Sequence, residues 1–197
     1  MGNRLNDDAL DTLFRTARTY NGYVDEPVTE NDIREIYELV KMGPTSANQQ
    51  PGRFIWCLSQ DAKDKLAAVV SPGNAPKVKA APATVIIAYD AEFHEHLPEL
   101  FPHADAKSWF AGNTELRERS GFLNATLQAG YFLLAARALG FDTGPMTGFD
   151  PKAVDAAFFA DRPHYRTVMI STFGHGDPSS IFGRLPRPEF DRFNSIA

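Results

Sequence analysis

Apolar residues recur along the chain at the spacings of helices and strands. Intervals of three and four residues predict an amphipathic helix over Asp8–Tyr20. Thr29 precedes Asp32 and a periodic apolar run, and this pattern predicts a capped helix that ends at Gly43. The residues after this helix are expected to form a loop.

Short apolar runs predict three strands, at Arg53–Ser59, Ala83–Asp90 and Thr167–Phe173. Further helices are expected at Ala62–Val70, Glu115–Leu139 and Lys152–Phe159, the last opened by Asp150 and Pro151. The helix at 115–139 lacks proline and is apolar nearly all round from Leu123, so we expect it in the core or in a subunit interface. The interleaved elements indicate an α/β or α+β fold with a small sheet between helices.

The composition indicates one folded domain over residues 1–197. Hydrophobic residues make up 43% and charged residues 23%, as in ordinary globular proteins. The net charge of -5 and the lack of a Lys/Arg block argue against nucleic acid as a partner. No apolar run is long enough to cross a bilayer and the start of the chain is polar, so we expect no membrane span and a cytoplasmic location.

Two further features concern folding rather than chemistry. Cys57 is the single cysteine and lies in an apolar run, so we interpret it as a buried small hydrophobe. The tail from Gly176 onward is rich in Pro, Gly, Ser and Arg, and such a segment is stable only if it lies on something, such as another subunit.

The common catalytic motifs are missing. There is no Walker A motif, no G-x-S-x-G and no H-E-x-x-H, and Gly174-His175-Gly176 leads into proline and serines rather than into a dinucleotide-binding helix. His94, His96 and His103 stand in a Pro-rich acidic region and are weak evidence for a metal, so none is predicted.

A short neutral polar segment, residues 43–51, is the first candidate for ligand binding. It reads Gly-Pro-Thr-Ser-Ala-Asn-Gln-Gln-Pro between a predicted helix and a predicted strand. Its amides and hydroxyls suit the edge of a planar heteroaromatic ring. The alternative is an ordinary solvated loop that uses Asn, Ser and Pro for turns.

Scattered basic residues are the second candidate. Arg15, Arg18 and Thr19 near the end of the first predicted helix, with Arg184 and Arg187 in the tail, match a phosphate clamp, although surface arginines are common. Asn74 and Lys77 precede the strand at 83 and suit the pyrimidine edge of a flavin, where a cation stabilises the reduced ring. Taken alone, Lys77 is a solvated lysine.

Taken in order from Leu13 to Arg187, these segments resemble the nitroreductase family. Residues 44–51 resemble its P-S-x-x-N-x-Q-P loop, which is the most specific match, and residues 17–23 its R-R-S-x-R-x-F motif. Asn74 and Lys77 match its N-x-x-K, residues 145–149 (Pro-Met-Thr-Gly-Phe) its flavin-facing turn, and residues 184–187 (Arg-Leu-Pro-Arg) its C-terminal phosphate segment.

The resemblance implies an α+β nitroreductase-like fold with a central, mostly antiparallel sheet flanked by helices, and a homodimer with FMN at the interface. It implies FMN as the bound cofactor and NADH or NADPH as co-substrate. The residues that it assigns to FMN binding are Arg18, Thr19, Asn21, Pro44, Thr45, Ser46, Asn48, Gln50, Asn74, Lys77, Pro145, Met146, Thr147, Gly148, Arg184 and Arg187.

Three positions depart from the family pattern. Ala17 and Asn21 stand where the family has basic residues, so phosphate binding is expected to depend on Arg18, Arg184 and Arg187. Gly52 replaces the aromatic residue that often follows Q-P, and we expect it to leave more room near the flavin.

The chain is similar in particular to one subgroup, the malonic semialdehyde reductases of the Rut pyrimidine-degradation pathway. The shared signatures are A-R-T-Y-N-G at 17–22, G-P-T-S-A-N at 43–48, L-F-P-H at 100–103, D-T-G-P-M-T-G-F-D at 142–150 and R-L-P-R at 184–187. This similarity implies reduction of 3-oxopropanoate to 3-hydroxypropanoate.

The resulting hypothesis is a ping-pong reaction. The nicotinamide gives hydride to flavin N5 and leaves, and the substrate then receives the hydride in the same pocket, so no catalytic side chain is assigned beyond the support that Lys77 gives to the reduced flavin. The alternatives are a broad NAD(P)H-dependent nitro or quinone reductase and a flavin-binding protein without turnover.

Overall fold

The computed structural model describes residues 2–197 and contains one four-stranded antiparallel sheet with the strand order β1-β2-β4-β3. The strands are β1 (Gly52–Cys57), β2 (Ala83–Asp90), β3 (Asp142–Met146) and β4 (Tyr165–Gly174). β1 and β3 are therefore the two edge strands. This is the mostly antiparallel sheet that the family resemblance implied, which confirms the expected fold class.

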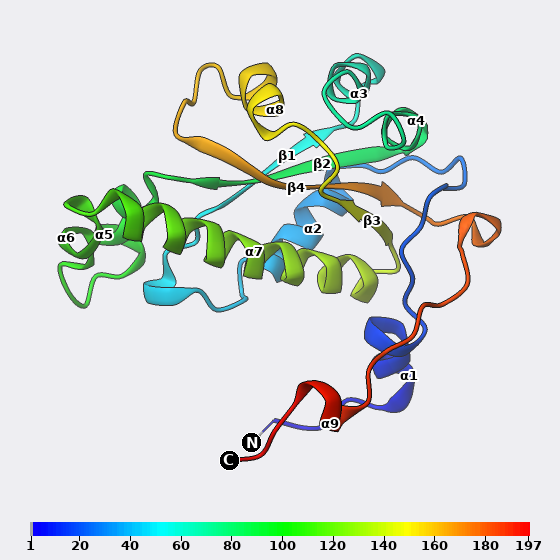
Figure 1. The fold of residues 1–197 in the computed structure, drawn as a ribbon, viewed down its shortest axis with the longest axis horizontal. Coiled ribbons are helices and arrows are strands. Elements are labelled where there is room, and N and C mark those ends of the chain that lie inside the picture. The colour runs from blue at the N-terminus through cyan, green and yellow to red at the C-terminus, as the bar shows by residue number, and fades with distance from the viewer. Residues whose placement is uncertain (1) are drawn as a thin grey trace.

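Helices cover both faces of the sheet, as Figure 1 shows. On one face lie α2 (Glu30–Val40) and the long α7 (Thr114–Ala138). On the other lie α3 (Gln60–Ala67), α4 (Ala75–Ala80) and α8 (Pro151–Phe158). Beyond the far end of the sheet are α5 (Leu97–Leu100) and α6 (Ala106–Ala111), while α1 (Asp7–Leu10) and α9 (Phe190–Phe193) belong to terminal segments that project from the sheet layers.

Each face of the sheet has its own apolar core. Phe132 of α7 and Ile36 of α2 pack with Val85 and Phe173 on one face. Leu66, Val154 and Ile170 belong to the core of the other face. The buried free thiol of Cys57 lies in this second core, and burial raises its pKa to about 11, which confirms its interpretation as a small hydrophobe.

The long helix α7 is apolar on two opposite sides. Its inner side buries Ala125, Ala129 and Phe132, while its outer side exposes Leu123 and Leu127. Exposed apolar stripes of this kind are typical of surfaces that contact another protein. Among the described residues no helix is long and apolar enough to span a membrane.

The capping residues explain several boundaries. Thr29 and Asp32 form a reciprocal capping box at the start of α2, and Asp150 caps α8 ahead of Pro151, both as predicted. Ser59, expected at the end of β1, instead caps α3 by accepting a hydrogen bond from the Ala62 N–H.

One prediction of local structure was wrong, and one strand was not predicted. The first helical segment ends in a π-helical turn at Asp11–Arg15 rather than at Tyr20, because the following residues are extended and the Tyr20 N–H donates to the Thr143 carbonyl. The strand β3 was not predicted, since Asp, Gly and Pro dominate its sequence. It forms because Thr143 and Pro145 are paired with β4.

Candidate flavin site

Three predicted phosphate contacts come together in one pocket of about 640 Å³. Arg18, Arg184 and Arg187 line it, from segments that are far apart in the sequence. Two crossed hydrogen bonds tie these segments, from Arg18 to the Phe182 carbonyl and from Arg184 to the Ala17 carbonyl, the latter 3.1 Å long. Guanidinium groups gathered in this way suit phosphate oxygens.

Arg15, a phosphate candidate in the sequence, does not reach the pocket, whereas Arg137, which no motif singled out, does. Arg15 forms ion pairs with Asp7 and Asp11 at 3.1 and 2.9 Å and does not line the pocket. Arg137, at the end of α7, does line it and donates to the Leu13 carbonyl at 2.9 Å. Burial lowers the pKa of Arg137, and the nearby charge of Asp142 opposes this effect.

Arg137 was not predicted as a pocket residue, because it stands in a helix and matches no motif. A cation in the last turn of a helix is usually explained by the helix dipole alone. Its place between the two terminal segments was visible only in three dimensions.

The edge strand β3 leads away from this pocket. At its start, Thr19 forms a parallel bridge with Thr143, and Asn21 donates to the Ser180 carbonyl at 3.1 Å. The approach is so close that a Cβ on Gly144 would lie 2.7 Å from the Tyr20 carbonyl oxygen. The rest of the strand, including Pro145 and Met146, pairs only with β4 on one side.

The other end of β3 meets the predicted pyrimidine contacts. The Asn74 amide donates to the Gly148 carbonyl at 3.0 Å, and a Cβ on Gly148 would lie 2.7 Å from that amide nitrogen. Lys77 is half-buried one turn further along α4, and Thr147 is exposed beside the glycine. Five residues of strand, about 16 Å long, therefore connect the arginine pocket with a group of neutral and cationic donors.

The segment Pro44–Pro51 is held elsewhere, against α7. The Ser46 N–H donates to the Asn124 side chain at 2.8 Å, and the Tyr131 hydroxyl donates to the Pro44 carbonyl at 2.8 Å. Asn48 donates to the Leu100 carbonyl at 2.9 Å, and Thr45 accepts from the Gln50 N–H at 3.2 Å. The side chains of Ser46 and Asn48 belong to exposed residues.

One chain does not bring all the predicted contacts together. The Pro44–Pro51 segment meets α7 as early as Ser120, through Gln49 at 3.0 Å, whereas Arg137 marks the arginine pocket. The same segment also meets α7 at Tyr131, six residues before Arg137, so its contacts lie about 9 to 25 Å along the helix from Arg137. None of residues 44–51 lines the arginine pocket, and the segment and the pocket are separate surfaces of one chain.

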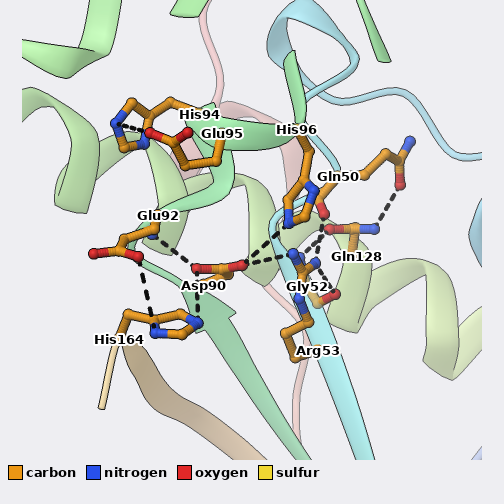
Figure 2. Close-up of polar contacts among 10 residues, drawn as sticks. All are labelled: Gln50, Gly52, Arg53, Asp90, Glu92, His94, Glu95, His96, Gln128 and His164. Carbon is orange, nitrogen blue, oxygen red and sulfur yellow. Dashed lines mark hydrogen bonds and ion pairs between the residues drawn. The ribbon is translucent and has the colours of Figure 1, made fainter. Parts of the chain in front are cut away.

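The space around Gly52 contradicts the expected extra room. A Cβ there would lie 2.7 Å from Oε1 of Gln128 and 3.0 Å from its Cδ. Figure 2 shows this carboxamide between Gly52 and Gln50. The room that the glycine leaves is filled by Gln128, so the expectation of a wider pocket was wrong.

A group of charged residues adjoins the same turn on the other side, as Figure 2 shows. The buried carboxylate of Asp90 lies 2.7 Å from Arg53, 3.7 Å from His96 and 3.9 Å from His164. In residues 2–197 no group of three or more His, Cys, Asp or Glu side chains is placed to hold a metal ion. His94 is buried and its pKa is lowered, first by desolvation and then by the charge of Arg117.

The α+β sheet, the arginine pocket and the polar groups along its edge strand define a protein suited to a phosphorylated planar ligand. The family model described as Nitroreductase matches residues 15–175, and the chain belongs to the nitroreductase family. FMN is the cofactor of this family, and a nicotinamide nucleotide is its co-substrate.

Individual relatives and solved structures agree with this placement. The chain is 56% identical over 191 residues to a protein of Xanthomonas oryzae that is provisionally named NADH dehydrogenase/NAD(P)H nitroreductase, covering 97% of both chains. The fold matches that of a Bacillus subtilis nitroreductase, YdfN, with a TM-score of 0.84 and 24% identity, covering 98% of this chain and 100% of that one. It also matches a nitroreductase of Exiguobacterium sibiricum in complex with FMN, with a TM-score of 0.84 and 20% identity over 99% and 100% of the two chains.

Proposed function

We propose that this chain is an FMN-dependent NAD(P)H oxidoreductase. The observation that carries the proposal is the open edge of β3, which joins the arginine pocket at one end to the Asn74 and Gly148 pair at the other. The names of the relatives, which contain NAD(P)H nitroreductase, support a nicotinamide co-substrate.

The arginine pocket fits the phosphate of FMN. Arg18, Arg184 and Arg187 supply guanidinium donors around it, with Arg137 as a fourth cation that can balance the dianion. Ala17 leaves no basic side chain at the first motif position, but its carbonyl holds Arg184 in place.

The strand edge fits the ring system. Thr19 and Asn21 lie at the phosphate end, and Pro145 and Met146 lie along the edge. Because Asn74 holds the Gly148 carbonyl, the backbone of Thr147 and Gly148 is fixed where a ring edge would meet it. The cation of Lys77 at the pyrimidine end would stabilise negative charge as it develops there.

When bound, FMN would accept hydride from the reduced nicotinamide nucleotide and deliver it to the substrate. The residues of this chain bind and orient the ring and present cations where charge develops. No side chain is assigned as a general acid, and we propose that the proton comes from water.

We also propose a homodimer in which Pro44, Thr45, Ser46 and Asn48 of a second copy complete the site. The exposed apolar side chains of α7 support this, because Phe122 is 52% and Leu123 59% exposed. The projecting C-terminal tail gives further support, since its apolar side chains are exposed, with Phe193 at 68% and Ile196 at 90%.

The proposed substrate is 3-oxopropanoate, reduced to 3-hydroxypropanoate. The signature segments shared with the semialdehyde reductases support it. The names of the relatives favour a second candidate, a broad reductase of nitroaromatics and quinones.

The test begins with the visible absorption spectrum of the purified protein and anaerobic addition of NADH and NADPH. Flavin absorption that bleaches supports the oxidoreductase, whereas a protein that FMN cannot reconstitute contradicts it, and bound flavin that does not bleach indicates a flavin-binding protein without turnover. Turnover of 3-oxopropanoate is then compared with that of nitrofurazone and menadione. Activity on the latter two alone would exclude the semialdehyde as substrate.

A further inference from the structure

The turn at Gln50 adopts a backbone conformation that its own residue type does not favour. Gln50 has a φ of 42°, and Ala47 and Asn48 each have a φ of 48°, all in the left-handed region. For residues other than glycine this conformation persists only where the surroundings impose it. The segment Pro44–Pro51 therefore depends on contacts from outside itself.

The side chain of Gln50 points inward and serves the turn. Its Oε1 accepts a hydrogen bond of 2.7 Å from the Gln128 amide, and its Nε2 donates to the Asn48 side chain at 3.1 Å. The same Nε2 lies 3.4 Å from the Lys41 carbonyl. With its donors and acceptor engaged in this way, Gln50 is part of the support of the segment, while Asn48 carries its exposed amide.

Gln128 holds this turn from α7. Its side chain is 2% exposed, and its Oε1 accepts from the Gly52 N–H at 2.7 Å while its Nε2 donates to Gln50. One carboxamide thus satisfies a backbone donor and a side-chain acceptor that flank Pro51. Figure 2 shows these two hydrogen bonds in sequence.

Gly52 is the counterpart of this arrangement. Its φ does not lie in the left-handed region, so the backbone conformation itself would accept a side chain. The nearest obstruction is the Gln128 carboxamide, whose Oε1 and Cδ would lie 2.7 and 3.0 Å from a Cβ at this position, and a ring carbon of Phe54 follows at 3.3 Å. Gly52 and Gln128 are therefore coupled: the glycine leaves the space that the Gln128 carboxamide occupies, and the carboxamide accepts a hydrogen bond from the glycine N–H.

Arg53 of β1 fixes the same turn from the side of the sheet. One terminal nitrogen of Arg53 donates to the carbonyls of Gln50 and Gly52 at 3.0 and 3.1 Å, and the other donates to Asp90 at 2.7 Å. The turn is thus fixed on both sides, by a neutral amide from α7 and by an ion-paired guanidinium from β1.

We propose that Gln128, coupled to Gly52, is a positioning residue that holds the Pro44–Pro51 segment in its flavin-binding conformation. This inference rests on the proposed function and deepens it. Gln128 acts through Gln50 on the presentation of Ser46 and Asn48, and it touches neither cofactor nor substrate itself. The segment is then preset before FMN arrives, so its ordering does not reduce the affinity.

The test is a double-mutant cycle on FMN affinity in the reconstituted protein. We expect Gln128→Met, which keeps the volume and removes both hydrogen bonds, to raise the FMN dissociation constant about tenfold. Gly52→Ala is expected to have a similar effect, because its methyl group displaces the Gln128 carboxamide. In a Gln128→Ala background, however, Gly52→Ala should change the constant less than about twofold, since the nearest obstructing atoms are gone and the Phe54 ring carbon at 3.3 Å needs only a small shift.

Gly112→Ala is the matched control, because a Cβ at Gly112 meets nothing within 4 Å and its φ is −93°. It should leave FMN affinity unchanged. Relief of the Gly52→Ala effect by the second substitution is a readout that a general loss of folding would not give. Fold-changes that simply multiply would overturn the coupling, and unaltered affinity in Gln128→Met would overturn the positioning role.

Hydrogen exchange separates failure of this inference from failure of the proposed function. The Gly52 N–H should exchange faster in Gln128→Met, and in Gln128→Glu it should stay protected because the acceptor oxygen remains. Parent protein that binds no FMN would refute the proposed function, while the exchange rates would still show whether Gln128 holds the Gly52 N–H. Unchanged exchange of the Gly52 N–H in Gln128→Met would refute the positioning role of Gln128 even where FMN binds.

Discussion

The two groups of predicted flavin contacts are held in place by different physical means. Around the arginine pocket, Arg18 and Arg184 cross between the N-terminal and C-terminal segments and reach only backbone carbonyls. The Pro44–Pro51 segment is instead held by buried neutral amides of α7, among them Asn124 and Gln128. Buried amide networks of this kind fix one geometry, whereas exposed guanidinium groups can adjust to a ligand.

The two groups owe their ordered geometry to different contacts. The amide segment is preset by its own chain, with 0% exposure of Gln49 and 2% of Gln128. The arginine pocket has cations whose mutual repulsion is relieved only by an anion, so we expect its order to increase on phosphate binding. The predictions below test this contrast.

The largest effect is expected when two pocket cations are removed together. Arg18→Ala combined with Arg187→Ala should raise the FMN dissociation constant at least about 100-fold, because each charge-assisted hydrogen bond contributes about 1.5–3 kcal/mol. Fluorescence titration of the apoprotein measures the change. The control is Arg15→Ala, whose ion pairs with Asp7 and Asp11 lie outside the pocket, and it should have no such effect.

If the double variant retains FMN with nearly unchanged affinity, the arginine pocket does not hold the phosphate. Of the two groups, only the Pro44–Pro51 segment would then remain as a predicted flavin contact. An intermediate step is the single Arg187→Ala variant, which should lose part of its flavin during gel filtration.

The sequence predicted much of the fold because local signals agreed with the tertiary structure. The capping box at Thr29, the proline after Asp150 and the proline-free run of α7 each determine a boundary through chemistry near that boundary. The strand β3 was not predictable in this way, since it contains Asp142, Gly144 and Pro145 and is a strand only through its pairing with β4.

For the candidate site, the motifs predicted residues that bind the ligand but not the residues that hold them in place. Motif order placed Arg18, Arg184 and Arg187, and the structure brings them into one pocket. Neither Arg137 nor Gln128 belongs to a motif, because each acts from a helix interior through contacts that depend on packing. Gly52 was misinterpreted for the same reason, since only the packing shows what fills its space.

The next largest effect is expected at the proposed dimer surface, where the Pro44–Pro51 segment of one copy would join the arginine pocket of the other. Leu123→Glu places a charge on the exposed apolar side of α7, where Leu123 is 59% exposed. If a second copy covers this side, the buried unpaired charge should shift the protein toward the monomer and weaken FMN binding about tenfold or more. Sedimentation measures the shift.

Gln60→Glu is the matched control, since it places the same charge on the exposed start of α3. This control should change neither the mass of the assembly seen in sedimentation nor the affinity for FMN. A monomeric parent protein that binds FMN fully would contradict the proposed role of a second copy.

A smaller effect is expected from Arg137, which belongs to the pocket but is partly engaged elsewhere. Arg137→Gln keeps a donor for the Leu13 carbonyl and removes the charge, so FMN affinity should fall about threefold to tenfold, less than for the exposed arginines. Salt titration sharpens the assignment, because the lost charge should also make binding less sensitive to ionic strength. An unchanged salt dependence would show that Arg137 does not act on the phosphate.

The smallest effect concerns Asp142, which lies at the start of β3 near Arg137 of the arginine pocket. Its pKa is raised, first by desolvation, while the Gly176 N–H and the charges of His175 and Arg137 oppose the shift. The folded state therefore binds more protons than the unfolded state in the window above the ordinary Asp pKa, and stability falls as pH rises through it. Asp142→Asn removes this penalty and should raise the free energy of unfolding at pH 7 by less than about 1 kcal/mol, since the side chain is only partly buried.

Urea unfolding at a series of pH values from about 4 to 7 measures this difference, which should shrink toward the acid end because the parent carboxyl is then protonated as well. Asp177→Asn gives the opposite sign, because hydrogen bonds from Ser179 lower the pKa of Asp177 and its stabilisation is lost as pH falls. If the two variants instead show the same pH trend, the burial of Asp142 is not the cause. The carboxylate of Asp142 beside the arginine pocket would then have no more effect on the pH dependence of stability than the neutral amides that hold the Pro44–Pro51 segment.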